Sequence, residues 1–191
     1  MNKQSDIRDI DDEQLVALAK VQLPYQMEAY EELMRRHQQK LYALCLKTVG
    51  YAEDAEDITQ EVMLKVFHSL KGFSGDAKLT TWLYSIASNA CLDHLRKRQR
   101  AAIFSAPMYE GEQVAVHDTV DDKIQADKAL ACLEEQDRLI INLRYTVGLS
   151  LEEIAEALNM KSSAAKMRFY RAMDKLRAIL SEGEQAAPPI Q

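Results

Sequence analysis

Apolar residues recur at the three- and four-residue spacing of a buried helix face along most of the chain. This spacing predicts four helices in the first hundred residues and at least three in the last seventy. No segment alternates apolar and polar residues between turn signals, as a half-buried strand does. We therefore expect an all-α fold. The first four helices are expected to begin after Asp11 and Asp12, near Tyr30, near Glu53, and at Leu79 or Thr80, with a stop near Gly50 and a loop over residues 71–76.

The helical pattern lapses between residues 101 and 125, where Pro107, Gly111 and a run of acidic residues occur. A segment of this composition, without lasting apolar spacing, is typical of a linker. We expect two small helical domains, a flexible acidic linker between them and a disordered C-terminal tail. Their bounds are 1–100 for the first domain, 101–125 for the linker, 126–182 for the second domain and 183–191 for the tail.

The second domain carries the pattern of two helices joined by a tight turn. Ser150 and Glu153 form a capping box, in which the serine caps the amide three residues on and the glutamate returns the bond. Asn159 follows the first helix, and asparagine tolerates the left-handed conformation that such a turn needs. A second helix, capped by Ser162 or Ser163, turns basic residues away from its apolar stripe. The arrangement is typical of a DNA-binding helix-turn-helix, although a plain helical hairpin with a solvated basic face has the same pattern.

Charge is distributed in blocks along the chain. The net charge is −6, which as a uniform surface would repel DNA. However, acidic residues are concentrated in residues 53–61 and 110–122, and basic residues in 93–100 and 161–177. This alternation predicts one surface for a basic protein partner and two surfaces for a polyanion.

Several classes of protein are disfavoured by what the chain contains. Its longest uncharged stretch, residues 79–92, has 14 residues, whereas a membrane-spanning helix needs about 20. The N-terminus has no apolar core of a signal peptide, so we expect a cytoplasmic protein that is not inserted in a membrane. We expect no metal, no cofactor and no enzymatic activity, because there is no Gly-rich phosphate loop or nucleophile–base pair and the cysteines are far apart. The cysteines are Cys45, Cys91 and Cys132, and buried or neutral thiols are expected.

Two surfaces of the first domain are candidates for binding. On the helix expected from Glu53 to Leu70, acidic and amide groups surround Leu64 on the face opposite the apolar stripe. Such a face suits a basic partner helix, and a merely solvated face fits equally well. Aromatic residues between Phe73 and Tyr84 then precede the basic run at 96–100, a combination that suits single-stranded nucleic acid. For Trp82, the spacing itself favours a place in the core.

Both domains resemble the bacterial sigma factors. Residues 54–66 (Asp-Ala-Glu-Asp-Ile-Thr-Gln-Glu-Val-Met-Leu-Lys-Val) and 81–84 (Thr-Trp-Leu-Tyr), with Ile86, Ala87 and Asn89, resemble region 2 of that family. Residues 148–155 (Gly-Leu-Ser-Leu-Glu-Glu-Ile-Ala), with the basic positions of 166–177, resemble region 4. The resemblance covers roughly residues 25–180. The chain's size, and the lack of another domain between the two regions, resemble the extracytoplasmic-function (ECF) group of the sigma-70 family.

The resemblance implies a division of labour among named residues. One acidic face would bind the clamp helices of the RNA polymerase β′ subunit, and the loop Phe73–Leu79 would capture a base flipped from the −10 non-template strand. A second set would border melted DNA at the −10 element, and the helix after the turn would read the −35 element as duplex. The three sets are Asp57, Gln60 and Glu61 for core polymerase; Lys65, Ser69, Phe73, Tyr84, Ser85 and Asn89 for the −10 element; and Ser162, Ser163, Lys166, Met167, Tyr170 and Arg171 for the −35 element.

The resemblance also implies partners and a biological role. These are core RNA polymerase (through the β′ clamp helices and the β flap), promoter DNA, and an anti-sigma factor that holds the protein inactive until a stress or envelope signal. The promoter sequence is not implied, because Ser163-Ala-Ala165 stands where the family usually has Gly-Thr-Val, and Ser74 and Ser85 stand where Arg is common. Two other readings remain open: a helix-turn-helix regulator that acts without replacing a sigma factor, and a sigma mimic that titrates a regulator.

Overall fold

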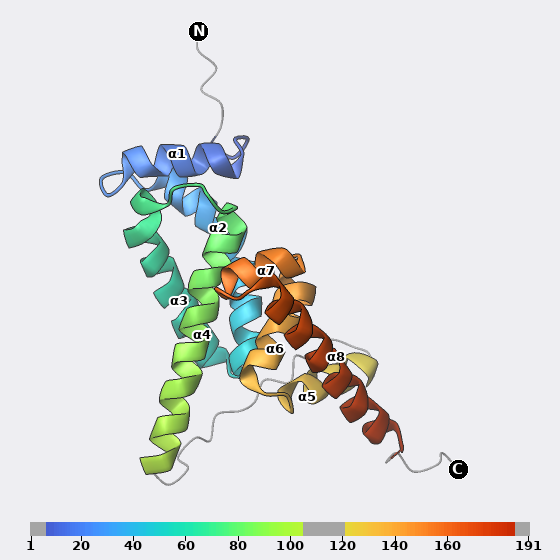
Figure 1. The fold of residues 1–191 in the computed structure, drawn as a ribbon. Helices are drawn as coiled ribbons and strands as arrows, with labels where there is room; N and C mark the ends of the chain where they lie inside the picture. Colours follow the sequence, from blue (N-terminus) through green and yellow to red (C-terminus); the bar gives the residue numbers. More distant parts are fainter. Residues whose placement is uncertain (1–6, 105–120, 186–191) are drawn as a thin grey trace.

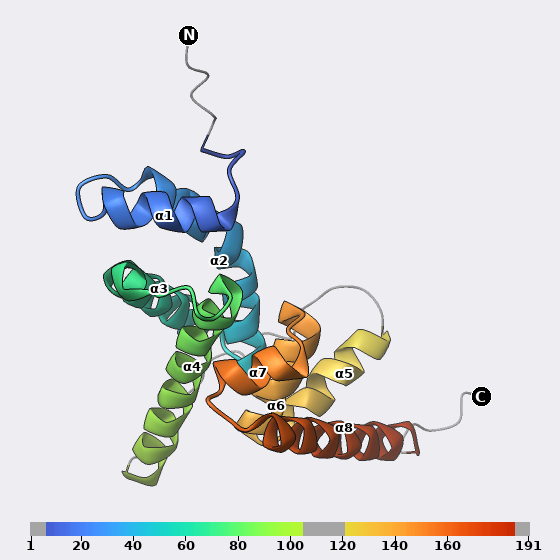
Figure 2. The ribbon, with the colours of Figure 1, turned by 45° about the horizontal axis from the view of Figure 1, so that its top comes forward.

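The computed structural model describes residues 7–104 and 121–185, and within them every regular element is helical. The helices form two domains, α1–α4 and α5–α8 (Figures 1 and 2). An all-α fold of two small helical domains is therefore confirmed. The helix bounds are α1 Asp12–Gln22, α2 Glu28–Val49, α3 Ala52–Ser69, α4 Leu79–Phe104, α5 Asp121–Ala131, α6 Glu135–Asn142, α7 Leu151–Ala157 and α8 Ser162–Gln185, with a 3-10 turn η1 at Leu70–Gly72 and a π-helical turn η2 at Leu143–Val147.

In the N-terminal domain, α1 lies across one end of the α2–α4 bundle (Figure 1). Asp11 caps α1 through a capping box with Gln14, and Gly50 ends α2 at a φ of +87°, a left-handed conformation that glycine adopts without strain. The faces predicted from apolar spacing are the ones that pack together, and they bury a core of aliphatic side chains. Its fully buried members include Leu15, Leu33, Leu41, Leu44, Val62, Val66, Leu70 and Leu83.

In the C-terminal domain, α8 packs against α5, α6 and α7. A buried carboxylate, Asp137 of α6, fixes this packing, because it lies 3.2 Å from Nε of Arg168 and 2.7 Å from Nζ of Lys175. Ser150 and Glu153 form the predicted capping box at the start of α7. Asn159 has the predicted left-handed backbone, with a φ of 51°. The helix-turn-helix geometry expected from the sequence is therefore present.

The two domains contact each other directly. α2 packs against α6 and η2, while α4 packs against α6 and α7. Among the described residues, polar contacts cross the interface at Lys78, whose Nζ lies 2.8 Å from Oε1 of Glu153, and at Gln99, whose Nε2 donates to Oε1 of Glu135 at 3.1 Å. Buried residues of both domains form one continuous apolar cluster. The described residues thus adopt a closed arrangement, which the sequence did not predict.

Helix boundaries differ from the predicted ones at three places. Helix extends to Phe104 and resumes at Asp121, because residues 99–103 hold good helix formers and Asp suits a helix N-terminus. Both helices therefore enter the segment expected as the linker, of which residues 105–120 lie outside the described part. α8 runs to Gln185, three residues into the expected tail, and residues 186–191 of that tail also lie outside the described part. The helix begins at Ser162, and its first backbone hydrogen bond runs from Ala165 N to the Lys161 carbonyl at 3.0 Å. Lys161 therefore precedes the helix, in place of the predicted caps Ser162 or Ser163.

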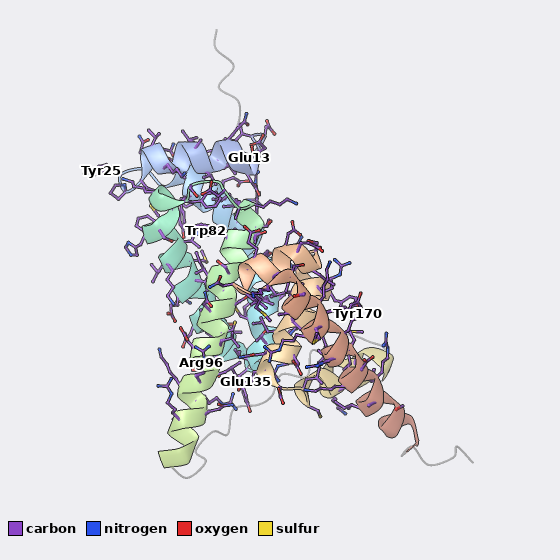
Figure 3. The ribbon with its side chains drawn as sticks, in the orientation of Figure 1. Glu13, Tyr25, Trp82, Arg96, Glu135 and Tyr170 are labelled. Carbon is purple, nitrogen blue, oxygen red and sulfur yellow. The ribbon has the colours of Figure 1, made fainter. Side chains whose placement is uncertain are left out.

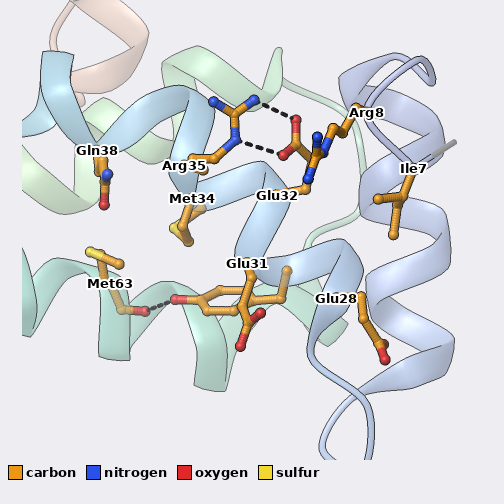
Figure 4. A pocket seen from close by; sticks show the side chains of 10 residues that line it. Ile7, Arg8, Glu28, Glu31, Glu32, Met34, Arg35, Gln38 and Met63 are labelled. Atoms are coloured by element: carbon orange, nitrogen blue, oxygen red, sulfur yellow. Dashed lines mark hydrogen bonds and ion pairs between the residues drawn. The ribbon is translucent and has the colours of Figure 1, made fainter.

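A charged cluster fastens α1 to α2 and gives a prediction about acid stability. Glu32 is buried beneath Arg35 and Arg36, whose Nε atoms donate to its carboxylate at 2.7 and 2.8 Å (Figure 4 draws the Arg35 pair). Arg36 also donates to the α1 residue Asp12 at 3.0 Å. The hydrogen bonds from Arg35 and Arg36 lower the pKa of Glu32 to about 2, and the bond from Arg35 has the larger effect.

A Glu32→Gln variant should lose part of the wild-type protein's dependence of stability on pH. The unfolded-state pKa of a glutamate is about 4.3. Because the folded-state value is lower, the ionised carboxylate stabilises the fold above about pH 4.3, and this contribution disappears as the pH falls towards 2. Urea unfolding should show that the free energy of unfolding decreases less from pH 7 to pH 3 in the variant than in the wild-type protein. Equal losses in both proteins would contradict the role assigned to Glu32.

Candidate nucleic-acid interface

The outer face of α8 presents the six positions predicted to read duplex DNA. All six side chains are exposed, including Met167 at 54% and Tyr170 at 60%, while Ala165, Phe169 and Ala172 of the same helix are buried. Tyr170 projects from α8 away from the other helices (Figure 3). The predicted division of this helix into a buried and an exposed face is therefore confirmed. The exposed set is Ser162, Ser163, Lys166, Met167, Tyr170 and Arg171.

Several basic side chains of α8 are paired with carboxylates and are therefore not free to bind a polyanion at its outer face. Arg168 and Lys175 are held by Asp137, and Arg177 pairs with Asp174 of its own helix at 2.9 Å. Lys166 lies 2.8 Å from Glu152 of α7, and this hydrogen bond raises the pKa of Lys166. Arg171 is exposed and has no ion-pair partner within the described ranges. The charge available to a polyanion on this helix is thus smaller than the sequence count indicates, and Arg171 is its clearest donor.

The outer face of α3 forms the second candidate surface. Asp57, Gln60 and Glu61 are exposed around Leu64, whose side chain is 61% exposed. The Lys65 ammonium lies 2.6 Å from a Glu61 carboxylate oxygen and lowers the pKa of Glu61. The face therefore combines acidic groups with one apolar side chain that no other element covers, as a docking surface for a basic helix requires.

Beside this helix, a pocket of about 710 Å³ opens among α2, α3 and the segment that precedes α1 (Figure 4). Tyr30 forms part of its wall and donates from its hydroxyl to the Met63 carbonyl at 2.6 Å. Burial raises the pKa of Tyr30 to about 12, so the hydroxyl stays protonated. The pocket's carboxylates include Glu28 and Glu31, and no nucleophile–base pair occurs among its lining residues.

The third candidate surface is the loop between η1 and α4. Phe73 and Trp82 are half-buried, and their ring centroids lie 4.9 Å apart at an interplanar angle of 34°. Trp82 therefore belongs partly to the core, as its spacing favoured, and partly to an aromatic pair at the surface of the N-terminal domain (Figure 3). Ser74 donates to Asp76 at 2.6 Å, and Gly75 between them has a φ of +87°. Residues 74–76 are exposed.

Tyr84 lies in a position that differs from the sequence prediction. It was expected to contact DNA, but its side chain is only 2% exposed, and burial raises its pKa to about 12. It lines a pocket of about 270 Å³ whose other walls include Val147, Gly148 and Leu149 of the C-terminal domain. In the closed arrangement Tyr84 is therefore not available to a DNA strand.

The other predicted −10 residues differ in exposure. Asn89 is exposed on α4, whereas Ser85 is half-buried and donates to the Trp82 carbonyl at 2.7 Å. Lys65 and Ser69 are exposed on α3, and the Ser69 hydroxyl donates to the Lys65 carbonyl. The set is thus divided between α3, the η1–α4 loop and α4, and the fold brings these elements together at one end of the domain (Figure 1).

Two lysines contribute to this region although the sequence analysis did not select them. Lys20 of α1 donates to the Phe73 carbonyl, 53 positions along the chain. Lys78, at the end of the loop, pairs with Glu153 of the C-terminal domain, 75 positions away. No spacing or motif connects residues so far apart, so only the three-dimensional structure could reveal these contacts.

The described residues hold no group of three or more His, Cys, Asp or Glu side chains that could bind a metal ion. Of the three thiols expected to be buried or neutral, Cys45 and Cys91 are buried, whereas Cys132 is exposed. It lies in the turn just after α5, where little packs over it. Within residues 7–104 and 121–185, no helix combines the length and apolar content needed to cross a membrane.

Comparison with known proteins decides the family. Residues 33–101 match sigma-70 region 2, and residues 123–176 match sigma-70 region 4. The chain is 29% identical to the ECF RNA polymerase sigma factor SigW of Bacillus subtilis over 169 residues, which cover 81% of this chain and 90% of SigW. It is 32% identical to the ECF RNA polymerase sigma factor SigM of Mycobacterium tuberculosis over 158 residues, which cover 80% and 77%.

The chain belongs to the ECF group of the sigma-70 family. Its fold is similar to the sigma factor RpoE of Bartonella quintana, solved in complex with the anti-sigma factor NepR: the TM-score is 0.69 at 25% identity, over 80% of this chain and 96% of that one. The relatives that this chain matches are sigma factors, which are transcription regulators rather than enzymes. Region 2 of this ECF sigma factor contains the α3 face and the η1–α4 loop, and region 4 contains α7 and α8.

Proposed function

We propose that this ECF sigma factor binds core RNA polymerase and directs it to promoters, reading the −35 element through α8 and the −10 element through region 2. The observation that carries the proposal is the exposed face of α8, where Ser162, Lys166, Tyr170 and Arg171 point away from the domain on the second helix of a helix-turn-helix. Such a helix fits the major groove, which is about 12 Å wide.

The −10 element would be recognised as an opened strand. Flipping a base out of the duplex costs a few kcal/mol of unstacking, and stacking on an aromatic side chain returns about 1–3 kcal/mol for each base. Phe73 and Trp82 supply the aromatic surface, and the exposed residues 74–76 lie beside it. Lys65, Ser69, Ser85 and Asn89 would border the strand, and Tyr84 would join them once the C-terminal domain moves away.

Core polymerase would bind mainly through the α3 residues Asp57, Gln60 and Glu61, which surround Leu64 and would contact the basic β′ clamp helices. Region 4 would contact the β flap. An anti-sigma factor is a further partner, and the complex of the similar Bartonella protein with NepR supports this. The protein would act in the cytoplasm, in a stress or envelope response.

Run-off transcription from fragmented genomic DNA of the source bacterium tests the proposal. The reactions contain that bacterium's core polymerase with and without the protein. We expect discrete new transcripts whose templates share two upstream elements. If the protein alone binds duplex DNA tightly and specifically but yields no new transcripts, it is a helix-turn-helix regulator that does not replace a sigma factor. If it binds a protein partner but neither binds duplex DNA nor yields transcripts, it is a sigma mimic that titrates a regulator.

An Arg171→Ala variant should weaken initiation at promoters that depend on the −35 element. If Arg171 makes a bidentate contact to a guanine, its loss costs about 1–3 kcal/mol, or roughly 5- to 150-fold in affinity. Arg177→Ala is the matched control, because Arg177 is exposed on the same helix but pairs with Asp174. Run-off assays on promoters with single −35 substitutions should show relaxed base preference at one position in Arg171→Ala alone. An unchanged preference would exclude base reading by Arg171.

A further inference from the structure

A lysine of α1 holds the start of the loop that precedes α4. The Lys20 ammonium donates to the backbone carbonyl of Phe73 and lies 5.5 Å from the centroid of the Phe73 ring. The same ring packs against Trp82 of α4. Lys20, Phe73 and Trp82 therefore form a stack that joins α1, the loop and α4. A cation over an aromatic face is attracted by the ring quadrupole, so both contacts favour the same position of Phe73.

The two ends of the loop are held by different parts of the molecule. At its first residue, Phe73, the contacts come from α1 and α4 of the same domain. At its other end, Lys78 pairs with Glu153 of the C-terminal domain. Separation of the domains breaks the second contact and leaves the first intact. The stack on Lys20 is then a side-chain contact that still holds the start of the loop in an open molecule.

We propose that Lys20 is a positioning residue for −10 recognition, which keeps Phe73 in place so that residues 74–76 and the aromatic pair meet a flipped base in a fixed geometry. This inference rests on the proposed function. Lys20 acts through Phe73 and need not touch DNA. Its effect should therefore be on discrimination between bases at the captured position, more than on binding of core polymerase or of the −35 duplex.

The test compares Lys20→Met, which keeps much of the side chain's length but removes the charge and the donor, with Lys20→Arg, which keeps both. Run-off transcription is measured on a mapped promoter and on variants with each other base at the captured −10 position. Discrimination between the preferred base and its competitors should fall about fivefold in Lys20→Met, the size expected of a surface cation–π contact together with a hydrogen bond. Lys20→Arg should restore most of it.

A spectroscopic measurement on the free protein separates positioning from general destabilisation. Trp82 is the single tryptophan of the chain, so its fluorescence reports on the stack. Acrylamide quenching of Trp82 should increase in Lys20→Met and not in Lys20→Arg or in Lys128→Met, a control that removes an exposed charge from α5. Unfolding midpoints show whether the fold is retained.

The outcomes distinguish the inference from the function on which it rests. If the wild-type protein supports no initiation, the proposed function fails. If the wild-type protein initiates and Lys20→Met keeps the wild-type base discrimination, the positioning role of Lys20 is wrong. A loss of discrimination that Lys20→Arg does not restore, or that Lys128→Met shares, also overturns it.

Discussion

An Asp57→Lys variant should lose most of its affinity for core RNA polymerase while keeping its fold. Asp57 lies on the outer face of α3 beside Leu64, turned away from the buried residues Ile58 and Val62. Reversing its charge replaces an attraction to a basic helix with a repulsion. Like charges brought together at an interface cost several kcal/mol, so we expect a decrease in affinity of roughly 30-fold or more.

The matched control for this variant is Glu56→Lys, which makes the same charge change one residue earlier. An adjacent residue on an α-helix is rotated by about 100°, so Glu56 lies towards the side of the proposed docking face. Both side chains are exposed, so neither change should alter packing. Circular dichroism and the unfolding midpoint verify that both variants are folded.

Affinity is measured by competition with wild-type protein for core polymerase, at two salt concentrations because exposed charges are screened by salt. The defect of Asp57→Lys should be larger at low salt. Equal affinity of Asp57→Lys and wild-type protein would exclude the α3 face as the polymerase surface. An equal loss in Glu56→Lys would indicate a general effect of added positive charge.

The parts of the fold that follow from local rules were predictable. The apolar spacing that defines one face of a helix is a property of the helix itself, so it predicted the buried and exposed sides of α3 and α8. The capping box at Ser150 and Glu153 and the left-handed Asn159 depend on neighbouring residues only, and both occur. The exposed positions assigned to the −35 surface are accessible for the same reason.

The parts that depend on distant residues were not predictable. Apolar spacing shows that a helix has a buried face but not which element covers it. The Lys20–Phe73 and Lys78–Glu153 contacts, and the packing of α2 and α4 on the C-terminal domain, are of this kind. The π-helical turn η2, which ends at Gly148 with a φ of +92°, is also absent from the pattern.

Tyr84 is a different case, because the sequence contained a signal against the prediction. It precedes Ser88 by four residues, Cys91 by seven and Leu95 by eleven, the spacing of one helix face, and all four side chains are buried. The resemblance to region 2 assigned Tyr84 to DNA, and its helical periodicity, which points to the core, was not applied to it. The structure agrees with the periodicity for the closed arrangement.

Locking the two domains together should prevent promoter opening without preventing binding to polymerase. Elements at −35 and −10 are about 25 base pairs apart, or roughly 85 Å of B-DNA. A compact chain of this length has a diameter of about 40 Å. The closed arrangement is therefore too short to reach both elements, and in it the side chain of Tyr84 is only 2% exposed. If the proposed function holds, initiation requires the domains to separate.

The lock can be built at Gln99 and Glu135, whose side chains meet across the interface at 3.1 Å and belong to none of the proposed binding sets. Cys132 is first replaced by serine, because it is the exposed one of the chain's three cysteines. Gln99→Cys and Glu135→Cys are then introduced and joined by a short bismaleimide. A second cross-linker that contains a disulfide gives a reversible lock, because a reductant cleaves the cross-link.

Run-off transcription from a two-element promoter should decrease in proportion to the cross-linked fraction and recover when the cleavable linker is reduced. The α3 face and the outer face of α8 remain exposed in the closed arrangement, so binding to a β′ clamp fragment and to a −35 duplex should be unchanged. Gln99→Cys alone, treated with the same reagent, controls for modification. Normal initiation by fully cross-linked protein would show that the domains need not separate. Loss of clamp binding as well would mean that the cross-link distorts region 2 rather than only holding region 4 against it.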